Sequence, residues 1–145
     1  MWDFATTKGA VLYLCLEDSL TRIQNRLFQI TEDAPDTLHF ATLAGSIGGG
    51  LEDQLKGFLT EHPGTALVVI DTLQKVRQPG ENANPYASDY RDITAMKRLA
   101  DEYGIAILLI HHLRKEKAED VFHRISGTTA ISGAVDSSFT LVEEK

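Results

Sequence analysis

Three runs of consecutive apolar residues are visible along the chain, and polar residues follow each of them. The runs are AVLYLCL at residues 10–16, ALVVI at residues 66–70 and IAILLI at residues 105–110. An uninterrupted apolar run rich in strand-forming residues is typical of a strand that is covered on both faces, as in a parallel sheet. We therefore expect these runs to form three buried strands.

Apolar residues recur at helical spacing in three other segments, at residues 20–30, 51–61 and 90–103. Ser19 precedes the first segment and is predicted to cap it, because a serine hydroxyl can accept a hydrogen bond from an amide of the first helical turn. Gly104 follows the third segment and is predicted to end it. Strands thus alternate with helices along the chain.

The remaining segments complete the expected fold. Residues 37–42 are predicted to form a short strand, and residues 130–142 one or two final strands. Residues 78–87 contain prolines, a glycine and asparagines, which predicts a loop, and residues 114–127 predict a charged loop. Parallel neighbouring strands need a crossover, which is usually a helix, so the pattern indicates an α/β fold with a mostly parallel sheet flanked by helices.

The composition narrows the class of protein. The 145 residues, 43% of them apolar, suffice for a single domain with a hydrophobic core, and no apolar run reaches the roughly 18 residues of a membrane helix. The amino-terminal residues show no basic region followed by an apolar run, so we expect a cytoplasmic protein with no membrane partner. A net charge of -7 argues against a broad nucleic-acid surface and leaves room only for local DNA contacts. The single Cys15 lies within an apolar run and is expected to be buried.

Polar side chains follow all three buried strands at their carboxyl ends. They are Glu17 with Asp18, Asp71 with Thr72, and His111 with His112. Ligands of open α/β sheets bind outside the carboxyl ends of the strands, so these side chains should converge on one crevice. We expect the carboxylates of Glu17 and Asp71 and one imidazole to lie within roughly 10 Å of each other, since adjacent strands are about 4.8 Å apart.

The residues alone allow more than one use of these groups. An acid that ends a buried strand, as in VVID, can present its carboxylate to a hydrated magnesium ion beside a nucleotide, or it can cap the next turn. Glu17 is open in a similar way: it can act as a catalytic base, or it can cap the following helix. A zinc site is disfavoured, because two adjacent histidines cannot easily bind one ion and no further Cys or His has ligand spacing.

Four segments, taken in order, resemble a known family. VLYLCLEDS, ALVVIDTL, GIAILLIHHLRK and RISGTTAISGAVDSSFTLV are similar to the RecA-like ATPases of plasmid and phage replication, the hexameric RepA-type helicases and their relatives among the AAA ATPases. The resemblance extends from about Trp2 to Val142. It implies a RecA-like core, ATP and Mg²⁺ as ligands of the intact protein, homo-oligomers, and single-stranded DNA as a partner of the intact parent.

The resemblance also implies residue roles. Glu17 matches the base that orients the attacking water, and Asp71 matches the Walker B carboxylate that holds magnesium through water. Thr72 and Asp18 lie next to these two acids and are expected at the nucleotide. His111 or His112 matches the sensor of the γ-phosphate; strand alternation allows only one of them to face the crevice, and His112 is favoured.

Two further matches concern the charged segment after the third strand. Residues 126–129 match the loop before the last core strands. Arg124 matches an arginine that acts on the nucleotide of a neighbouring subunit, although a salt bridge to Asp120 or exposure to solvent accounts for it equally well.

The chain departs from the family in lacking the phosphate-binding loop. ATP phosphates are held by G-x-x-x-x-G-K-[ST], and no such string occurs; GSIGGG at residues 45–50 has no lysine and is predicted to be a flexible turn. In the family, the loop's strand and helix precede the segment that begins this chain. The 145 residues are therefore expected to form one truncated RecA-like domain, shortened in the gene or on expression, that binds neither ATP nor Mg²⁺ well by itself.

In the family the missing strand lies beside the strand that ends in the sensor, so residues 105–110 or 138–142 should form a free sheet edge. We expect this edge to be compensated by pairing of these two segments, by capture of the amino-terminal segment, or by a second copy of the chain.

Three functions remain open at this point. The first is a fragment of an ATPase that couples hydrolysis to DNA handling in replication, as a helicase or a related protein, and that is inactive alone. The second is a non-catalytic RecA-like remnant or oligomerisation module. The third is a divalent-metal-dependent hydrolase that uses Glu17, Asp18 and Asp71 as an acidic cluster.

Overall fold

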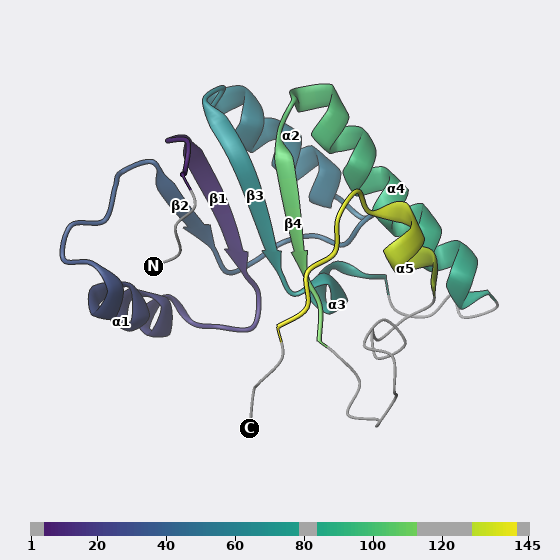
Figure 1. The fold of residues 1–145 in the computed structure, drawn as a ribbon, viewed down its shortest axis with the longest axis horizontal. Coiled ribbons are helices and arrows are strands. Elements are labelled where there is room, and N and C mark those ends of the chain that lie inside the picture. Colours follow the sequence, from purple (N-terminus) through teal and green to yellow (C-terminus); the bar gives the residue numbers. More distant parts are fainter. Residues whose placement is uncertain (1–4, 79–83, 113–128, 142–145) are drawn as a thin grey trace.

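A computed structural model describes residues 5–78, 84–112 and 129–141 of the chain. Its centre is a sheet of four strands in the order β2-β1-β3-β4, and every neighbouring pair is parallel (Figure 1). The strands are β1 (Ala10–Cys15), β2 (Leu38–Ala41), β3 (Thr65–Asp71) and β4 (Ala106–Ile110). The predicted α/β fold with a parallel sheet is confirmed.

In the described part of the chain, five helices connect or follow these strands. They are α1 (Leu20–Ile30), α2 (Leu51–Glu61), α3 (Leu73–Val76), α4 (Pro85–Tyr103) and α5 (Thr129–Ala134). The Ser19 hydroxyl accepts a hydrogen bond from the Arg22 amide at 3.4 Å, and Gly104 ends α4 in the left-handed conformation with φ 64°. Both predicted caps are therefore confirmed. None of these helices is long and apolar enough to cross a membrane, as far as the described residues go.

Two predicted boundaries are wrong. Helix α4 begins at Pro85 instead of residue 90, because the Asn84 side chain accepts a hydrogen bond from the Ala87 amide and proline suits the first helical turn. Residues 129–134 form α5 instead of a strand, and no strand occurs in residues 135–141. The reason is a helical period: Ile131, Ala134 and Val135 all reach the hydrophobic core, as residues three or four apart do on one helix face.

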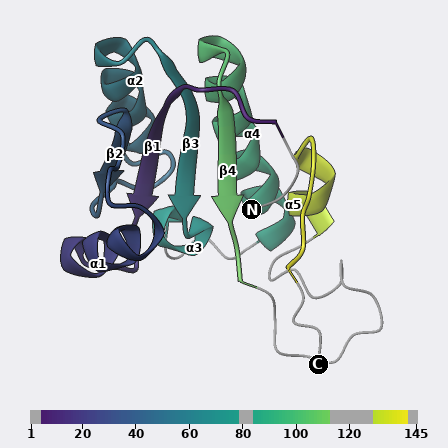
Figure 2. The ribbon, with the colours of Figure 1, turned by 60° about the vertical axis from the view of Figure 1, so that its left-hand side comes forward.

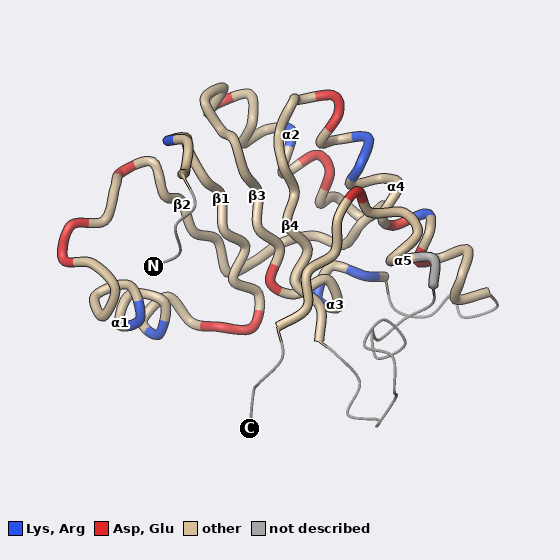
Figure 3. Tube along the Cα trace, in the orientation of Figure 1, with Lys and Arg blue, Asp and Glu red and all other residues tan. Residues whose placement is uncertain are grey.

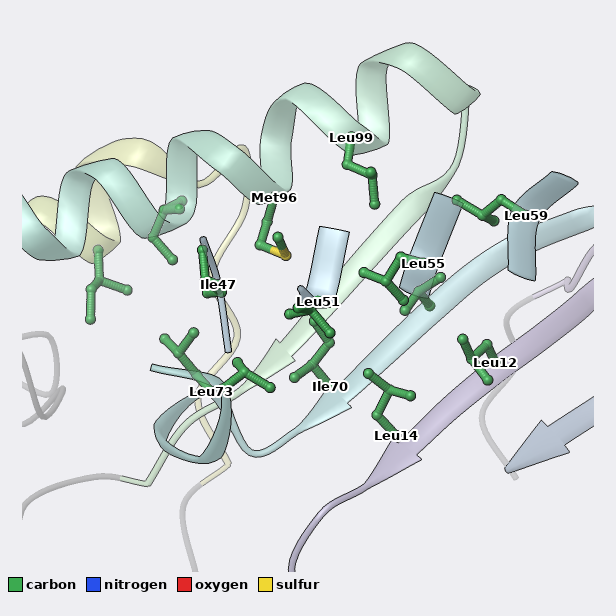
Figure 4. Close-up of a cluster of buried hydrophobic side chains, with 14 residues drawn as sticks. Leu12, Leu14, Ile47, Leu51, Leu55, Leu59, Ile70, Leu73, Met96 and Leu99 are labelled. Carbon is green, nitrogen blue, oxygen red and sulfur yellow. The ribbon is translucent and has the colours of Figure 1, made fainter. Parts of the chain in front are cut away.

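The hydrophobic core lies between one face of the sheet and helices α2 and α4 (Figure 1 and Figure 4). Alternate strand residues contribute to it, and apolar residues one turn apart contribute from the helices. Its most buried members include Leu12, Leu14, Val68, Ile70, Leu51, Leu55, Leu59, Ile93, Met96 and Leu99. Each such side chain contributes about 1.5–3 kcal/mol through burial, so this layer fixes the strands and their carboxyl ends in space.

The opposite face of the sheet, which we call the open face, carries the other alternate residues, among them Tyr13, Val69 and Leu108. No helix of the described residues crosses β3 and β4 on this face (Figure 1 and Figure 2). Helix α1 lies near β2. At the other end of the sheet, the Leu108 side chain on β4 is 44% exposed. The apolar strands were predicted to be covered on both faces, and this is wrong for β4, where Leu108 is exposed, whereas Val69 of β3 is buried on the same face.

Strand β4 is an edge strand. Among the described residues it pairs only with β3, and neither residues 138–141 nor residues 5–9 add a strand beside it. The free edge predicted for residues 105–110 is therefore present. Closure by pairing with the described part of residues 138–142, or with residues 5–9, is not observed.

Candidate active site

The carboxyl ends of β1, β3 and β4 lie at the same level of the sheet. Asp71 is in register with Cys15 on one side and with Ile110 on the other, and the Leu16 amide donates to the Asp71 carbonyl at 2.8 Å. The residues that follow each strand therefore emerge together, below the arrowheads in Figure 1. This places the predicted site residues at one edge of the sheet.

Glu17 is held between the ends of the other two strands. Its Oε1 accepts a hydrogen bond from the Thr72 hydroxyl at 3.2 Å, and its Oε2 lies 3.4 Å from His112 Nε2. The Glu17 and His112 side chains are 42% and 71% exposed, whereas Thr72 is fully buried. The expectation that a carboxylate and one imidazole meet at this edge is confirmed for Glu17 and His112.

Asp71 presents its carboxylate to β1. The Tyr13 hydroxyl donates to Asp71 Oδ2 at 3.0 Å, and no described residue forms a hydrogen bond with Oδ1. Burial, together with this hydrogen bond and the nearby negative charge, raises the pKa of Tyr13 to about 12, so the phenol keeps its proton and stays a donor. The Asp71–Thr72 peptide bond is cis.

Sequence reasoning missed Tyr13. Tyr13 and Asp71 are diagonal neighbours on adjacent strands, because Tyr13 is in register with Val69. That register is not encoded in either strand alone.

Two residues near the site behave as ordinary structural groups. Cys15 is buried as expected, and burial, followed by the charge of Asp71, raises its pKa to about 11, which keeps the thiol protonated. Asp18 forms ion pairs with Arg22 and Arg26 of α1 instead of turning toward Thr72 or Glu17. Figure 3 shows this acidic turn after β1 next to the basic positions of α1. The structure therefore does not join Asp18 to the Glu17, Thr72 and His112 group.

His111 lies on the inner side of the same edge. Burial, followed by the positive charges of Arg77 and His112, lowers the pKa of His111. Arg77 itself is held by the buried carboxylates of Asp89 and Asp92, which belong to α4. Burial raises the pKa of Asp92 despite this partner. Sequence analysis did not detect this ion-pair network, because its members lie on separate elements and match no motif.

The oxygen groups at the edge fit magnesium better than zinc. Within residues 5–78, 84–112 and 129–141, no three His, Cys, Asp or Glu side chains are close enough to enclose a metal ion. Magnesium does not need such a cage, since it typically takes one or two carboxylates and completes its shell with water and substrate phosphates. Asp71 suits that mode, because Tyr13 orients one of its oxygens and no described residue forms a hydrogen bond with the other.

The glycine-rich turn at residues 45–50 does not offer a phosphate cradle. The Gly48 amide donates to the Glu52 carboxylate at 2.9 Å, and the Gly45 amide donates to the Gln54 side chain at 2.8 Å. The Ile47 amide donates to the Val76 carbonyl at 2.7 Å, and Ile47 is buried. The turn lies between β2 and α2, as predicted, and these hydrogen bonds anchor it to α2 and α3. These amides are already used by the chain's own groups.

Arg124 and most of the segment before α5 lie outside the described residues. The structure therefore gives no position for the predicted trans-acting arginine.

Comparisons with known proteins agree with this architecture. A model of the AAA domain family matches residues 1–118. Among solved structures, an ATPase domain of another protein is similar, with a TM-score of 0.64 and 14% sequence identity over 88% of this chain. The chain corresponds to 57% of the length of that solved chain. No curated protein sequence matches.

The family match covers most of the chain, and the similarity to the solved structure, at this low identity, speaks for the fold alone. The chain belongs to the AAA domain family and has a RecA-like ATPase fold.

Proposed function

We propose that this chain is the part of a RecA-like ATPase that carries the water-activating, metal-binding and γ-phosphate-sensing residues, and that the complete protein couples ATP hydrolysis to DNA handling in replication. The observation that carries the proposal is the contact of Glu17 with both Thr72 and His112 at the carboxyl edge of the sheet. Family membership supports the ATPase part.

Each group at the edge has a chemical role in this proposal. Glu17 accepts a proton from the water that attacks the γ-phosphorus, while the bond from that phosphorus to the bridging oxygen of ADP breaks. Asp71 would hold a magnesium ion, and that ion would supply charge stabilisation for the phosphates. His112 contacts Glu17 directly, so a sensor that moves toward the γ-phosphate also changes the surroundings of the base.

The phosphate cradle must come from a further βα unit in this proposal. Strand β4 has a free edge where one more parallel strand can pair, and the open face above β3 and β4 has no covering helix among the described residues. Crossovers between parallel strands are right-handed. A crossover that runs from a new strand beside β4 back to β1 therefore puts its helix on the open face. The β1-α1-β2 crossover puts α1 on that face for the same reason. A phosphate loop at that position would lie at the same edge of the sheet as Asp71, beside the carboxyl end of β4.

The DNA and oligomer parts of the proposal rest on the family resemblance. The net charge of -7 limits DNA contacts to local basic segments, and the main candidate segment, at residues 114–124, lies outside the described residues. We also propose that the complete protein forms homo-oligomers and binds ATP with Mg²⁺. Arg124 would then act on the nucleotide of a neighbouring subunit.

The proposal is tested by supplying the missing unit. The chain is expressed with a strand, a G-x-x-x-x-G-K-[ST] loop and a helix joined before Met1, and ATP hydrolysis is measured with and without single-stranded DNA. We expect Mg²⁺-dependent hydrolysis that Glu17→Gln lowers by about 10²–10⁴-fold, the range for loss of a general base. Asp71→Asn should raise the Mg²⁺ concentration needed for half-maximal rate.

A matched acid controls for charge. Glu32 lies just after α1, so Glu32→Gln should leave hydrolysis unchanged. If neither substitution changes the rate of hydrolysis, Glu17 is not the catalytic base. If single-stranded DNA does not change the rate, the protein is an ATPase and the proposed DNA role is wrong.

A further inference from the structure

We propose that Tyr13 is a positioning residue for the Asp71 carboxylate, fixing which oxygen of Asp71 faces the magnesium ion. This inference rests on the proposed metal role of Asp71. It adds a residue that the family resemblance did not assign to the site.

The tyrosine ring is fixed independently of Asp71. Tyr13 lies in the middle of β1, flanked by β2 and β3, and its ring packs against Phe40 of β2 with centroids 6.0 Å apart. The hydroxyl therefore reaches Asp71 from a scaffold of three paired strands. A donor held in this way can orient a carboxylate that would otherwise rotate about its terminal bond.

The hydrogen bond divides the two oxygens of Asp71 between two tasks. Oδ2 accepts from the Tyr13 hydroxyl at 3.0 Å, which leaves Oδ1 as the oxygen available to a metal-bound water. Partners that hydrogen-bond to a ligating carboxylate orient it, and their removal typically lowers metal affinity about 10–100-fold. Tyr13 acts through Asp71 in this way, without touching the ion.

The position of Tyr13 on the open face strengthens the argument. Strand alternation places Tyr13 and Asp71 on the same face, on the side where a helix from a further βα unit would pack. Such a helix would exclude water from the phenol and the carboxylate, and a hydrogen bond in a drier site is electrostatically stronger. The same residue pair then supports the sheet and orders the metal site.

Paramagnetic broadening by Mn²⁺ tests the inference on the chain itself, because it detects even weak binding of the ion. Amide signals of residues 15, 71 and 72 are followed in two-dimensional NMR spectra during a Mn²⁺ titration. We expect broadening that Asp71→Asn abolishes and that Tyr13→Phe shifts to about tenfold higher Mn²⁺ concentration. Tyr90→Phe is the matched control, since Tyr90 is an exposed residue of α4, and it should leave the titration unchanged.

The outcomes separate this inference from the proposed function. Broadening that depends on Asp71 but is the same in the wild type and in Tyr13→Phe overturns the positioning role and leaves the metal role standing. Broadening that does not depend on Asp71 overturns both. A purely structural role of Tyr13 would lower the unfolding free energy of Tyr13→Phe without moving the Mn²⁺ titration, so urea unfolding of the same variant completes the test.

Discussion

Arg77 occupies an unusual electrostatic position for a residue so close to the site. Its side chain is 18% exposed and forms ion pairs with Asp89 and Asp92, whose side chains are 5% and 7% exposed. Burying charges is costly, and removing one partner leaves the others without compensation. Arg77 therefore ties the start of α4 to the segment that follows β3.

Replacing Arg77 by methionine should lower the free energy of unfolding by about 3–5 kcal/mol, because the buried carboxylates of Asp89 and Asp92 lose the guanidinium that they share, although Asp92 keeps its ion pair with Arg91. Arg26→Met is the control, because the pair of Arg26 with Asp18 is 67% exposed on the arginine side, and such surface pairs contribute about 0–1 kcal/mol. Urea unfolding followed by circular dichroism measures both. Equal losses in the two variants would contradict a structural role of the Arg77 network.

His111 predicts a pH dependence of stability. Burial lowers its pKa in the folded chain, so between the folded and unfolded pKa values the unfolded chain binds more protons. Stability should therefore fall as pH drops below about 6.5, the ordinary pKa of histidine, and be restored as pH rises above it.

The His111→Gln variant should show a shallower loss of stability between pH 6.5 and about 5, because the group that protonates on unfolding is gone. Thermal unfolding across this pH range measures the slope in both proteins. Identical slopes in the wild type and the variant would show that His111 does not cause the dependence.

At the scale of single elements, the two glycines of α2 allow a clean comparison of backbone effects. Gly50 caps the helix with φ 113°, whereas Gly57 lies inside it, and a Cβ added at either position meets no atom within 4 Å. Only backbone conformation therefore distinguishes the two positions.

Gly57→Ala should raise the free energy of unfolding by about 1 kcal/mol, because alanine has the better helix propensity. Gly50→Ala should lower it by about 1–3 kcal/mol, because a residue with a Cβ is strained at positive φ. Chemical denaturation gives both values. A stabilised Gly50→Ala variant would mean that the turn before α2 adopts another conformation in solution.

The elements also show what sequence patterns can predict. The apolar runs in residues 10–16, 66–70 and 105–110 predicted β1, β3 and β4, because a continuous apolar stretch has few other uses in an α/β protein. Helix α5 was mistaken for a strand, since TAISGA is too short for its helical period to stand out without knowledge of the surface of α4.

The same limit applies to the site. Glu17 and His112 were predictable from their places at strand ends, since parallel strands bring their carboxyl ends together. Tyr13 and Arg77 were not, because their partners are set by register and by the packing of α4.

Within the described residues the sheet has two edge strands, β2 and β4, and no described helix crosses β3 and β4 on the open face. An apolar edge strand invites pairing with another strand, and β4 carries Leu108, which is 44% exposed. Because pairing with residues 5–9 or 138–141 is not observed, we expect a second copy of the chain to use this edge.

The isolated chain should therefore self-associate as its concentration rises, and Leu108→Lys should give monomer or insoluble protein, because a charge at this position opposes edge pairing. Leu43→Lys is the control, since Leu43 is 87% exposed in the loop before α2 and away from this edge. Sedimentation velocity measures the association. A wild-type chain that stays monomeric at all concentrations would contradict pairing through β4.

The central proposal is that this chain carries the water-activating and metal-binding residues of an ATPase but not the G-x-x-x-x-G-K-[ST] loop that positions the γ-phosphate. Positioning and charge stabilisation carry nearly all of phosphoryl transfer, so Glu17 and His112 cannot compensate for its loss. The most direct measurement is ATP hydrolysis by the purified chain of residues 1–145 with Mg²⁺, beside Glu17→Gln. The account predicts background rates for both proteins. Turnover above background that Glu17→Gln abolishes would show that the chain binds and cleaves ATP without a phosphate loop, and would contradict the account.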